Sequence, residues 1–291
     1  MSIFPNEDMR RFIEAGHRIA APVLNATRPY AEWHQRMEPH VQRMAEIARS
    51  IEEGPRLTLI RSFTFARGGW HDAPLFNVPG GLKSLVDELV DKPNEEVRAR
   101  LDQVVPEIFR KDDHYVLEDM VARWDFYPGW RNQVFEDAVW AHKNEKYSLS
   151  VPALAPQIEG ILRQETGEYR RGPYWIRKVN NVLGFEYDSR KPPAPPTEQQ
   201  FEEALDALLS KELPDRYATA RRVSLELALF RVNALYNHGA FDDPQFVNSA
   251  NRHAILHGVS ENLSELTSIK LFCAVQLVHE IAFAYRKAAA D

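Results

Sequence analysis

Residues 249–258, "SANRHAILHG", hold the side chains whose types and spacing could do chemistry. His253 and His257 are four positions apart, so on a helix both imidazoles would face nearly the same way, a spacing that zinc enzymes use. Arg252 and His257 could instead cleave RNA, because arginine binds phosphate oxygens and imidazole transfers protons near neutral pH. The stretch could also be a buried polar seam whose side chains are hydrogen-bonded to neighbouring helices.

The spacing by itself decides little among these alternatives. A zinc site needs a third ligand, but no glutamate stands between the two histidines and no further ligand lies at a telling distance. Arg252 and His257 are five positions apart, which is about 140° around an ideal helix, so they do not share a face. Comparable spacings recur at Arg10, Arg11, Arg28 and Arg231 before His17, His34 and His238.

The longer string "NRHAILHG" resembles the motif of a bacterial branch of the HEPN superfamily (higher eukaryotes and prokaryotes nucleotide-binding). In these proteins an arginine and a polar residue precede a histidine by a few positions. The segment "YSLSVPALAPQIEGILRQ", residues 147–164, resembles an earlier helix of the same proteins, in which "QIEG" recurs. The motif also lies just before the last long helix, where the family has it. The resemblance covers roughly residues 115–291.

The resemblance implies a helical bundle that forms a homodimer, with the two motifs meeting at the dimer cleft, and a metal-independent endoribonuclease without a cofactor. The 2′-hydroxyl of the RNA would be the nucleophile. Arg252 would bind the phosphate, His257 would act as general acid or base, and Asn251 and His253 would orient the substrate or hold one tautomer of His257. Glu159 would be an acidic partner from the neighbouring helix, although a plain helix-edge carboxylate also fits.

The biological setting implied is bacterial stress, toxin–antitoxin systems or phage defence, with an antitoxin or sensor protein as a further partner. A second interpretation remains open. The chain could be a HEPN-like helical dimer that binds RNA, a nucleotide or a protein partner without cleaving anything, its motif serving as a polar seam.

Residues 163–178, "RQETGEYRRGPYWIRK", interleave cations with aromatic residues. Cations for phosphates and aromatic faces for unstacked bases are typical of surfaces that bind single-stranded RNA. A solvated surface whose aromatic residues anchor it to the core is the alternative. The candidate substrate-binding residues are Arg163, Arg170, Arg171, Tyr174, Trp175, Arg177 and Lys178.

Apolar residues recur at helical spacing along most of the chain, which predicts an all-α protein. Helices are expected at 115–125, 130–146, 151–165, 174–183, 198–212, 218–237, 245–257 and 265–287, and earlier around 82–89 and 94–109. Residues 55–81 are the exception and predict a structured loop. Thr197 and Gln200 form a capping box after a proline-rich connector at 190–200. Helix 218–237 is apolar on nearly every face, which predicts the central helix of the bundle.

We expect a domain boundary near residue 113. Residues 1–113 would form a mainly helical region of unknown role, without a functional motif, and residues 114–291 the HEPN-like bundle. Helix 265–287 carries more apolar surface than one bundle needs, which favours a homodimer.

Composition limits the partners. The net charge of −6 leaves no global positive field, so contact with RNA requires a local patch. Cys273 is the only cysteine, which excludes intrachain disulfides and multi-cysteine zinc sites and predicts a buried thiol in a reducing compartment. The N-terminal residues lack the apolar core of a signal peptide, and the apolar segment near the C-terminus is interrupted by Gln276, His279 and Glu280. We therefore expect a soluble, cytoplasmic protein that does not enter a membrane.

Overall fold

The computed structural model describes residues 54–70, 81–124, 129–170, 174–185, 197–235, 255 and 263–290. The chain divides into two compact units, residues 1–54 and 55–291, and every described residue except Gly54 belongs to the second unit. The regular elements of the described residues are α-helices, and these residues contain no β-strand. The prediction of an all-α fold is therefore confirmed.

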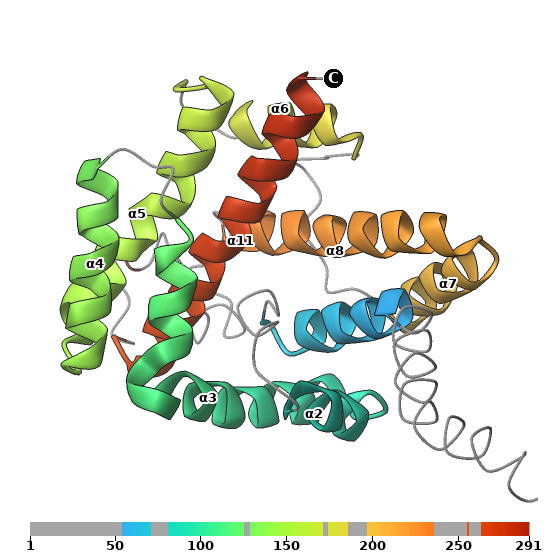
Figure 1. The fold of residues 1–291 in the computed structure, drawn as a ribbon, viewed down its shortest axis with the longest axis horizontal. Helices are drawn as coiled ribbons and strands as arrows, with labels where there is room; N and C mark the ends of the chain where they lie inside the picture. Colours follow the sequence, from blue (N-terminus) through green and yellow to red (C-terminus); the bar gives the residue numbers. More distant parts are fainter. Residues whose placement is uncertain are drawn as a thin grey trace, which may run out of the picture. The chain divides into compact units, whose positions relative to one another are not determined.

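Figure 1 shows the order of the helices, which begins with a helical segment at residues 54–67, all of it except Gly54 in the second unit. The helices that follow are α2 (Gly81–Leu89), α3 (Asn94–Ala122), α4 (Gly129–Lys143), α5 (Tyr147–Thr166), α6 (Tyr174–Leu183), α7 (Glu198–Leu209), α8 (Leu213–Leu235) and α11 (Glu265–Ala290). Most of the expected helices are thus confirmed with small shifts at their ends. The helix expected at 245–257 lies outside the described residues except for Ile255, which is helical.

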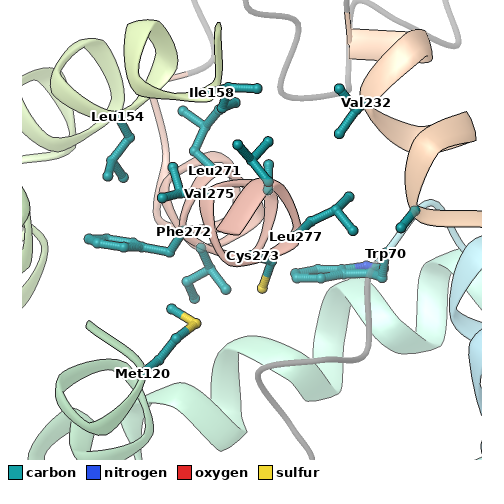
Figure 2. Close-up of a cluster of buried hydrophobic side chains, with 14 of the residues drawn as sticks. Trp70, Met120, Leu154, Ile158, Val232, Leu271, Phe272, Cys273, Val275 and Leu277 are labelled. Carbon is teal, nitrogen blue, oxygen red and sulfur yellow. The ribbon is translucent and has the colours of Figure 1, made fainter. Parts of the chain in front are cut away.

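The central helix of the unit is α11. It packs most extensively against α5 and also contacts α3, α6 and α8. Figure 2 shows it end-on, with Leu271, Phe272 and Leu277 directed into the surrounding side chains. By contrast, the described side chains of α8 are mostly exposed or half-buried, and only Ala220, Ala228, Leu229 and Val232 are buried. The prediction that helix 218–237 is the central one was therefore wrong.

The burial of α11 has two consequences for the sequence-based predictions. Ile269, Phe272 and Leu277 are at most 1% exposed within the chain itself, so this apolar side is covered by the chain's own helices and does not support self-pairing. Cys273 is buried as expected, and burial raises the pKa of its thiol. Among the described helices, α11 alone has the length and composition of a membrane span, and 67% of its most apolar stretch is buried inside the unit, as in a core helix.

A kink divides α3 into two arms. Asp112, Asp113 and His114 have positive φ angles of 50°, 53° and 65°, which reverses the handedness of the backbone for three residues. The Lys143 ammonium holds the kink from α4, 2.8 Å from Asp113 Oδ2 and 2.7 Å from Glu118 Oε1. Residues from both arms belong to the same core cluster, although residue 113 is the position at which the sequence suggested a domain boundary.

The loop expected at 55–81 is helical over residues 54–67, so the prediction was wrong for that part. Leu59 and Phe63 pack with Leu208 of α7 and Ala220 of α8 in a second, smaller cluster, whereas Phe65 belongs to the main core. Gly68 then follows, and a Cβ there would lie 2.5 Å from Leu101 Cδ1, so a larger residue would require the buried Leu101 side chain to shift. Residues 71–80 lie outside the described residues.

Candidate functional site

The stretch that carries the candidate chemistry is described at one position. Ile255 is helical, only 8% exposed, and part of the main core cluster. Asn251, Arg252, His253 and His257 lie outside the described residues, so their roles stay predictions. The described centre of "NRHAILHG" thus packs on the core that α11 organises.

Glu159, the acidic residue of "QIEG", lies in the middle of α5, the helix most closely packed against α11. Its side chain is 16% exposed, and its Oε1 accepts a hydrogen bond from Nε of Arg163, one turn further on. Arg131 of α4 lies beside the next residue, Gly160, where a Cβ would be in ordinary van der Waals contact, 3.5 Å from Nη2 of Arg131. The proposed pairing of Glu159 with residues 251–257 stays a prediction.

The end of α5 positions the candidate RNA-binding residues. Gly167 adopts a left-handed conformation with φ +64°, and its N–H donates to the Gln164 carbonyl. The Glu168 N–H donates to the Arg163 carbonyl at 3.2 Å, which completes a Schellman-type ending of the helix. Lys178 on α6 also donates to the carbonyl of Thr166 at 2.6 Å. These bonds fix the turn on which Glu168 and Arg170 lie.

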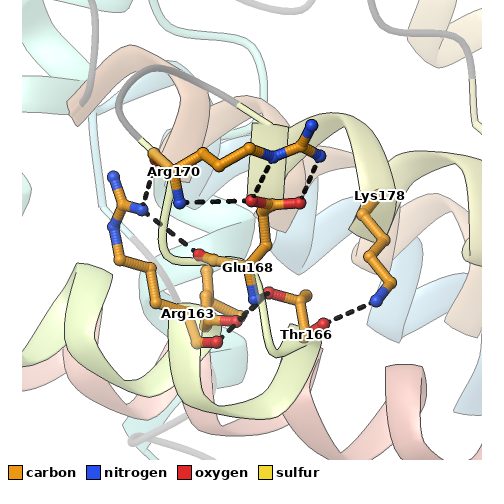
Figure 3. A network of polar contacts seen from close by, with 6 residues as sticks. Arg163, Thr166, Glu168, Arg170 and Lys178 are labelled. Atoms are coloured by element: carbon orange, nitrogen blue, oxygen red, sulfur yellow. Dashed lines mark hydrogen bonds and ion pairs between the residues drawn. The ribbon is translucent and has the colours of Figure 1, made fainter.

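Glu168 holds Arg170 in a bidentate ion pair at this turn (Figure 3). Nε and Nη2 of Arg170 donate to the two carboxylate oxygens at 2.7 and 2.6 Å. The Arg170 guanidinium lowers the pKa of Glu168 to about 2. The same guanidinium lies 4.5 Å from the ring centroid of Tyr174 on α6, while the Arg170 side chain remains 69% exposed. The cation is therefore oriented yet open to solvent.

Five exposed residues lie around this turn and along α6, and we call them the Arg170 surface: Tyr169, Arg170, Tyr174, Arg177 and Lys178. The structure thus brings together two aromatic rings and three cations, as the sequence suggested. An acidic residue lies among them, since Glu168 neutralises Arg170 in part.

Three of the predicted substrate-binding residues differ from the rest. Trp175 is 2% exposed in the main core, so it cannot stack on a base and its assignment was wrong. Arg163 is 18% exposed, and besides Glu159 its guanidinium donates to the carbonyls of Glu168 and Arg170 at 3.2 and 2.7 Å. It therefore holds the turn together from inside. Arg171 lies outside the described residues.

A buried polar junction that the sequence analysis missed joins α4, α5 and α11. Ser268 Oγ lies 2.9 Å from His142 Nδ1 and 2.8 Å from Ser150 Oγ, and all three residues are at most 1% exposed. The His142 ring also packs edge-on against His114 at the α3 kink, with ring centroids 5.3 Å apart. Burial lowers the pKa of His142 to about 4, and His114 adds to the effect.

A serine hydroxyl within hydrogen-bond distance of a histidine is the arrangement found in nucleophilic catalytic dyads. Neither side chain is accessible to a substrate, so the junction supports the fold instead. The sequence carries no signal for it, because His142 and Ser268 are separated by 126 positions and belong to no recognisable pattern. Within the described ranges, no group of three or more histidine, cysteine or acidic side chains could hold a metal ion.

Comparison of this chain with known proteins found no matching family model, no matching curated protein and no matching solved structure.

Proposed function

We propose that this protein is a HEPN-like, metal-independent endoribonuclease. The observation that carries the proposal is the string "NRHAILHG" immediately before the central helix of an all-α unit. The family resemblance expects this order, with the motif preceding the last long helix and "QIEG" on the helix beside it. The burial of Ile255 supports the proposal, because it attaches the middle of the motif to a rigid core.

In the proposed reaction the 2′-hydroxyl of the RNA attacks the adjacent phosphorus and the bond from phosphorus to the 5′-oxygen breaks, which leaves a 2′,3′-cyclic phosphate and a free 5′-hydroxyl. The protein takes the proton of the nucleophile, supplies one to the leaving oxygen and provides a cation for the phosphate. His257 accepts or donates the proton, and Arg252 binds the phosphate while negative charge develops on it. Asn251 and His253 orient the substrate or hold one tautomer of His257, and Glu159 is the acidic partner. An ordinary imidazole is present in both its neutral and its protonated form near neutral pH, so it can either accept or donate the proton.

The Arg170 surface supports the same proposal as the place where single-stranded RNA is held. Exposed cations would bind phosphates, and Tyr169, at 70% exposure, and Tyr174, at 43%, offer faces for unstacked bases. The surface is local, in keeping with the negative net charge of the chain. The proposed setting is bacterial stress, toxin–antitoxin systems or phage defence, with an antitoxin or sensor protein as partner.

Cleavage of RNA by the purified protein in EDTA tests the proposal. His257→Ala should abolish cleavage at an unchanged melting temperature, because a positioned acid–base group contributes about a hundred- to ten-thousand-fold in rate. Arg252→Lys keeps the charge but loses the planar fork, so cleavage should fall steeply as well. Arg98→Lys, an exposed arginine on α3, is the matched control and should cut like the unaltered protein.

The opposite result would show that the motif "NRHAILHG" has a structural role and is not catalytic. In that case His257→Ala would lower the melting temperature, because buried partners would lose a hydrogen bond, and the unaltered protein would not cut RNA at all.

The proposal includes a homodimer whose cleft unites the two motifs. Light scattering at micromolar concentration should give twice the chain mass of 33.5 kDa. A monomeric mass for a protein that cuts RNA would remove the composite site from the proposal.

A further inference from the structure

A groove between the second arm of α3 and α4 has the features of a small-molecule site. Its volume of about 580 Å³ lies within the range of ligand pockets. Val121, Phe135 and Val139 line it, and Trp124 and Trp140 supply aromatic surface. Trp124 and Phe135 are each 1% exposed and pack edge-on with centroids 4.7 Å apart, so this part of the wall is rigid. Trp140, by contrast, is 53% exposed.

The charges of the groove are unsuited to an anion. Lys143 is the only cation among its described lining residues, and its ammonium is already bound by Glu118 and by Asp113 of the kink. Glu136 adds a second carboxylate to the lining, on the exposed side of α4. A phosphate or carboxylate entering the groove would therefore meet negative charge that no further cation among the described lining residues balances.

The carboxylates are the polar groups that a positively charged ligand would meet here. Glu136 is exposed on α4, whereas the buried Oδ1 of Asn132 lies out of the reach of a ligand. The exposed ring of Trp140 also attracts cations, since the Lys146 ammonium lies 4.6 Å from its centroid. A positively charged amino group on an aromatic body would match both the carboxylates and the apolar wall.

We propose that the α3–α4 groove binds a small aromatic amine, with its ring against Trp140 and Val139 and its amino group directed to Glu136. The described lining shares no residue with those proposed for RNA cleavage, and the proposal does not depend on that activity. Because the groove borders Lys143, which holds the α3 kink, its occupant would also lie beside that kink.

Tryptamine and indole-3-acetate form a matched pair of probes, since both carry an indole ring but bear opposite charges. Titration of the full-length protein by calorimetry should show saturable binding of tryptamine, with a dissociation constant on the order of a millimolar. Indole-3-acetate should not bind measurably. Equal binding of the two probes, or no saturable binding of tryptamine, would overturn the proposal.

Variants then locate the site. Glu136→Gln should weaken tryptamine binding about two- to fivefold, as expected for one partly exposed charge. Asp137→Asn, the next residue of α4, is the control, because that carboxylate accepts from Gln133 outside the groove. Ala122→Trp, at an exposed position of the groove, should fill it and abolish binding. Unchanged binding in Ala122→Trp, or equal losses in the Glu136 and Asp137 variants, would show that tryptamine binds elsewhere. Circular dichroism on each variant verifies the fold.

Discussion

The hydroxyl of Ser268 lies 2.9 Å from Nδ1 of His142, and this contact joins the first turns of α11 to the last turn of α4. The same hydroxyl lies 2.8 Å from Ser150 Oγ near the start of α5. One buried side chain therefore links three helices at the end of the unit where the α3 kink also lies. Because the three side chains are at most 1% exposed, each lost hydrogen bond leaves a buried polar atom unsatisfied.

Ser268→Ala should lower the free energy of unfolding by about 1–3 kcal/mol, since His142 and Ser150 both lose their partner. Urea denaturation followed by circular dichroism measures the change. Ser148→Ala, at an exposed position of α5, is the control and should stay within about 0.5 kcal/mol of the unaltered protein. Equal stability of the two variants would mean that the junction contributes nothing.

Acid should destabilise the protein through His142. Its pKa is about 4 in the folded chain and 6.5 in its ordinary state, so between these values only the unfolded chain binds the proton. Stability is therefore complete above about pH 6.5 and falls as the pH drops toward 4, with a loss of about 1–2 kcal/mol between pH 7 and 5. Urea denaturation at both pH values measures it, and His142→Asn should remove most of this difference. A difference that persists in the variant would assign it to other groups.

Arg177→Ala should weaken binding of single-stranded RNA and reduce the salt dependence of that binding by about 0.7 in the logarithmic slope, because one phosphate contact is lost. Arg98→Ala removes an equal charge from exposed α3 and should change neither quantity. Fluorescence anisotropy with labelled RNA at several salt concentrations measures both. Equal losses of RNA affinity in the two variants would show that the effect comes from the net charge of the protein and not from a contact made by Arg177.

Protein purified without added metal should contain far less than one metal ion per chain, because only His253 and His257 are available as good ligands in the motif. Elemental analysis measures the content, and EDTA should leave the melting temperature unchanged. A stoichiometric metal that disappears with His253→Ala would instead favour the zinc interpretation and contradict the ribonuclease proposal.

Helical periodicity was sufficient to predict the amphipathic elements. The bounds of α6 agree with the expected 174–183, and the capping box of Thr197 and Gln200 starts α7 as expected. The segment at 54–67 was missed because Leu59 and Phe63 face one cluster and Phe65 faces another. A helix whose apolar residues face two clusters lacks a single apolar stripe, so its pattern is not recognised as helical periodicity.

Some features of the candidate site could likewise be predicted from the sequence, and others could not. The exposure of Tyr174, Arg177 and Lys178 and the burial of Trp175, Ile176 and Val179 follow from the 3.6-residue period, so Trp175 could have been recognised as a core residue. The bidentate ion pair between Glu168 and Arg170 could not have been predicted, because it depends on the left-handed Gly167 bringing Glu168 back over the helix end. The junction at Ser268 joins residues far apart in sequence, and only tertiary packing reveals it.

The left-handed turn at the α3 kink has a consequence in terms of chirality. Asp112, Asp113 and His114 adopt backbone angles that are the mirror image of those in both helical arms. For an L-residue such angles cost about 1–2 kcal/mol each, whereas a D-residue adopts them without that cost. A semisynthetic chain with D-aspartate at the exposed position 112 should therefore fold more stably, although the same inversion at Val97 or Leu117 would break the helix. At this bend the backbone has the conformation that a D-residue prefers.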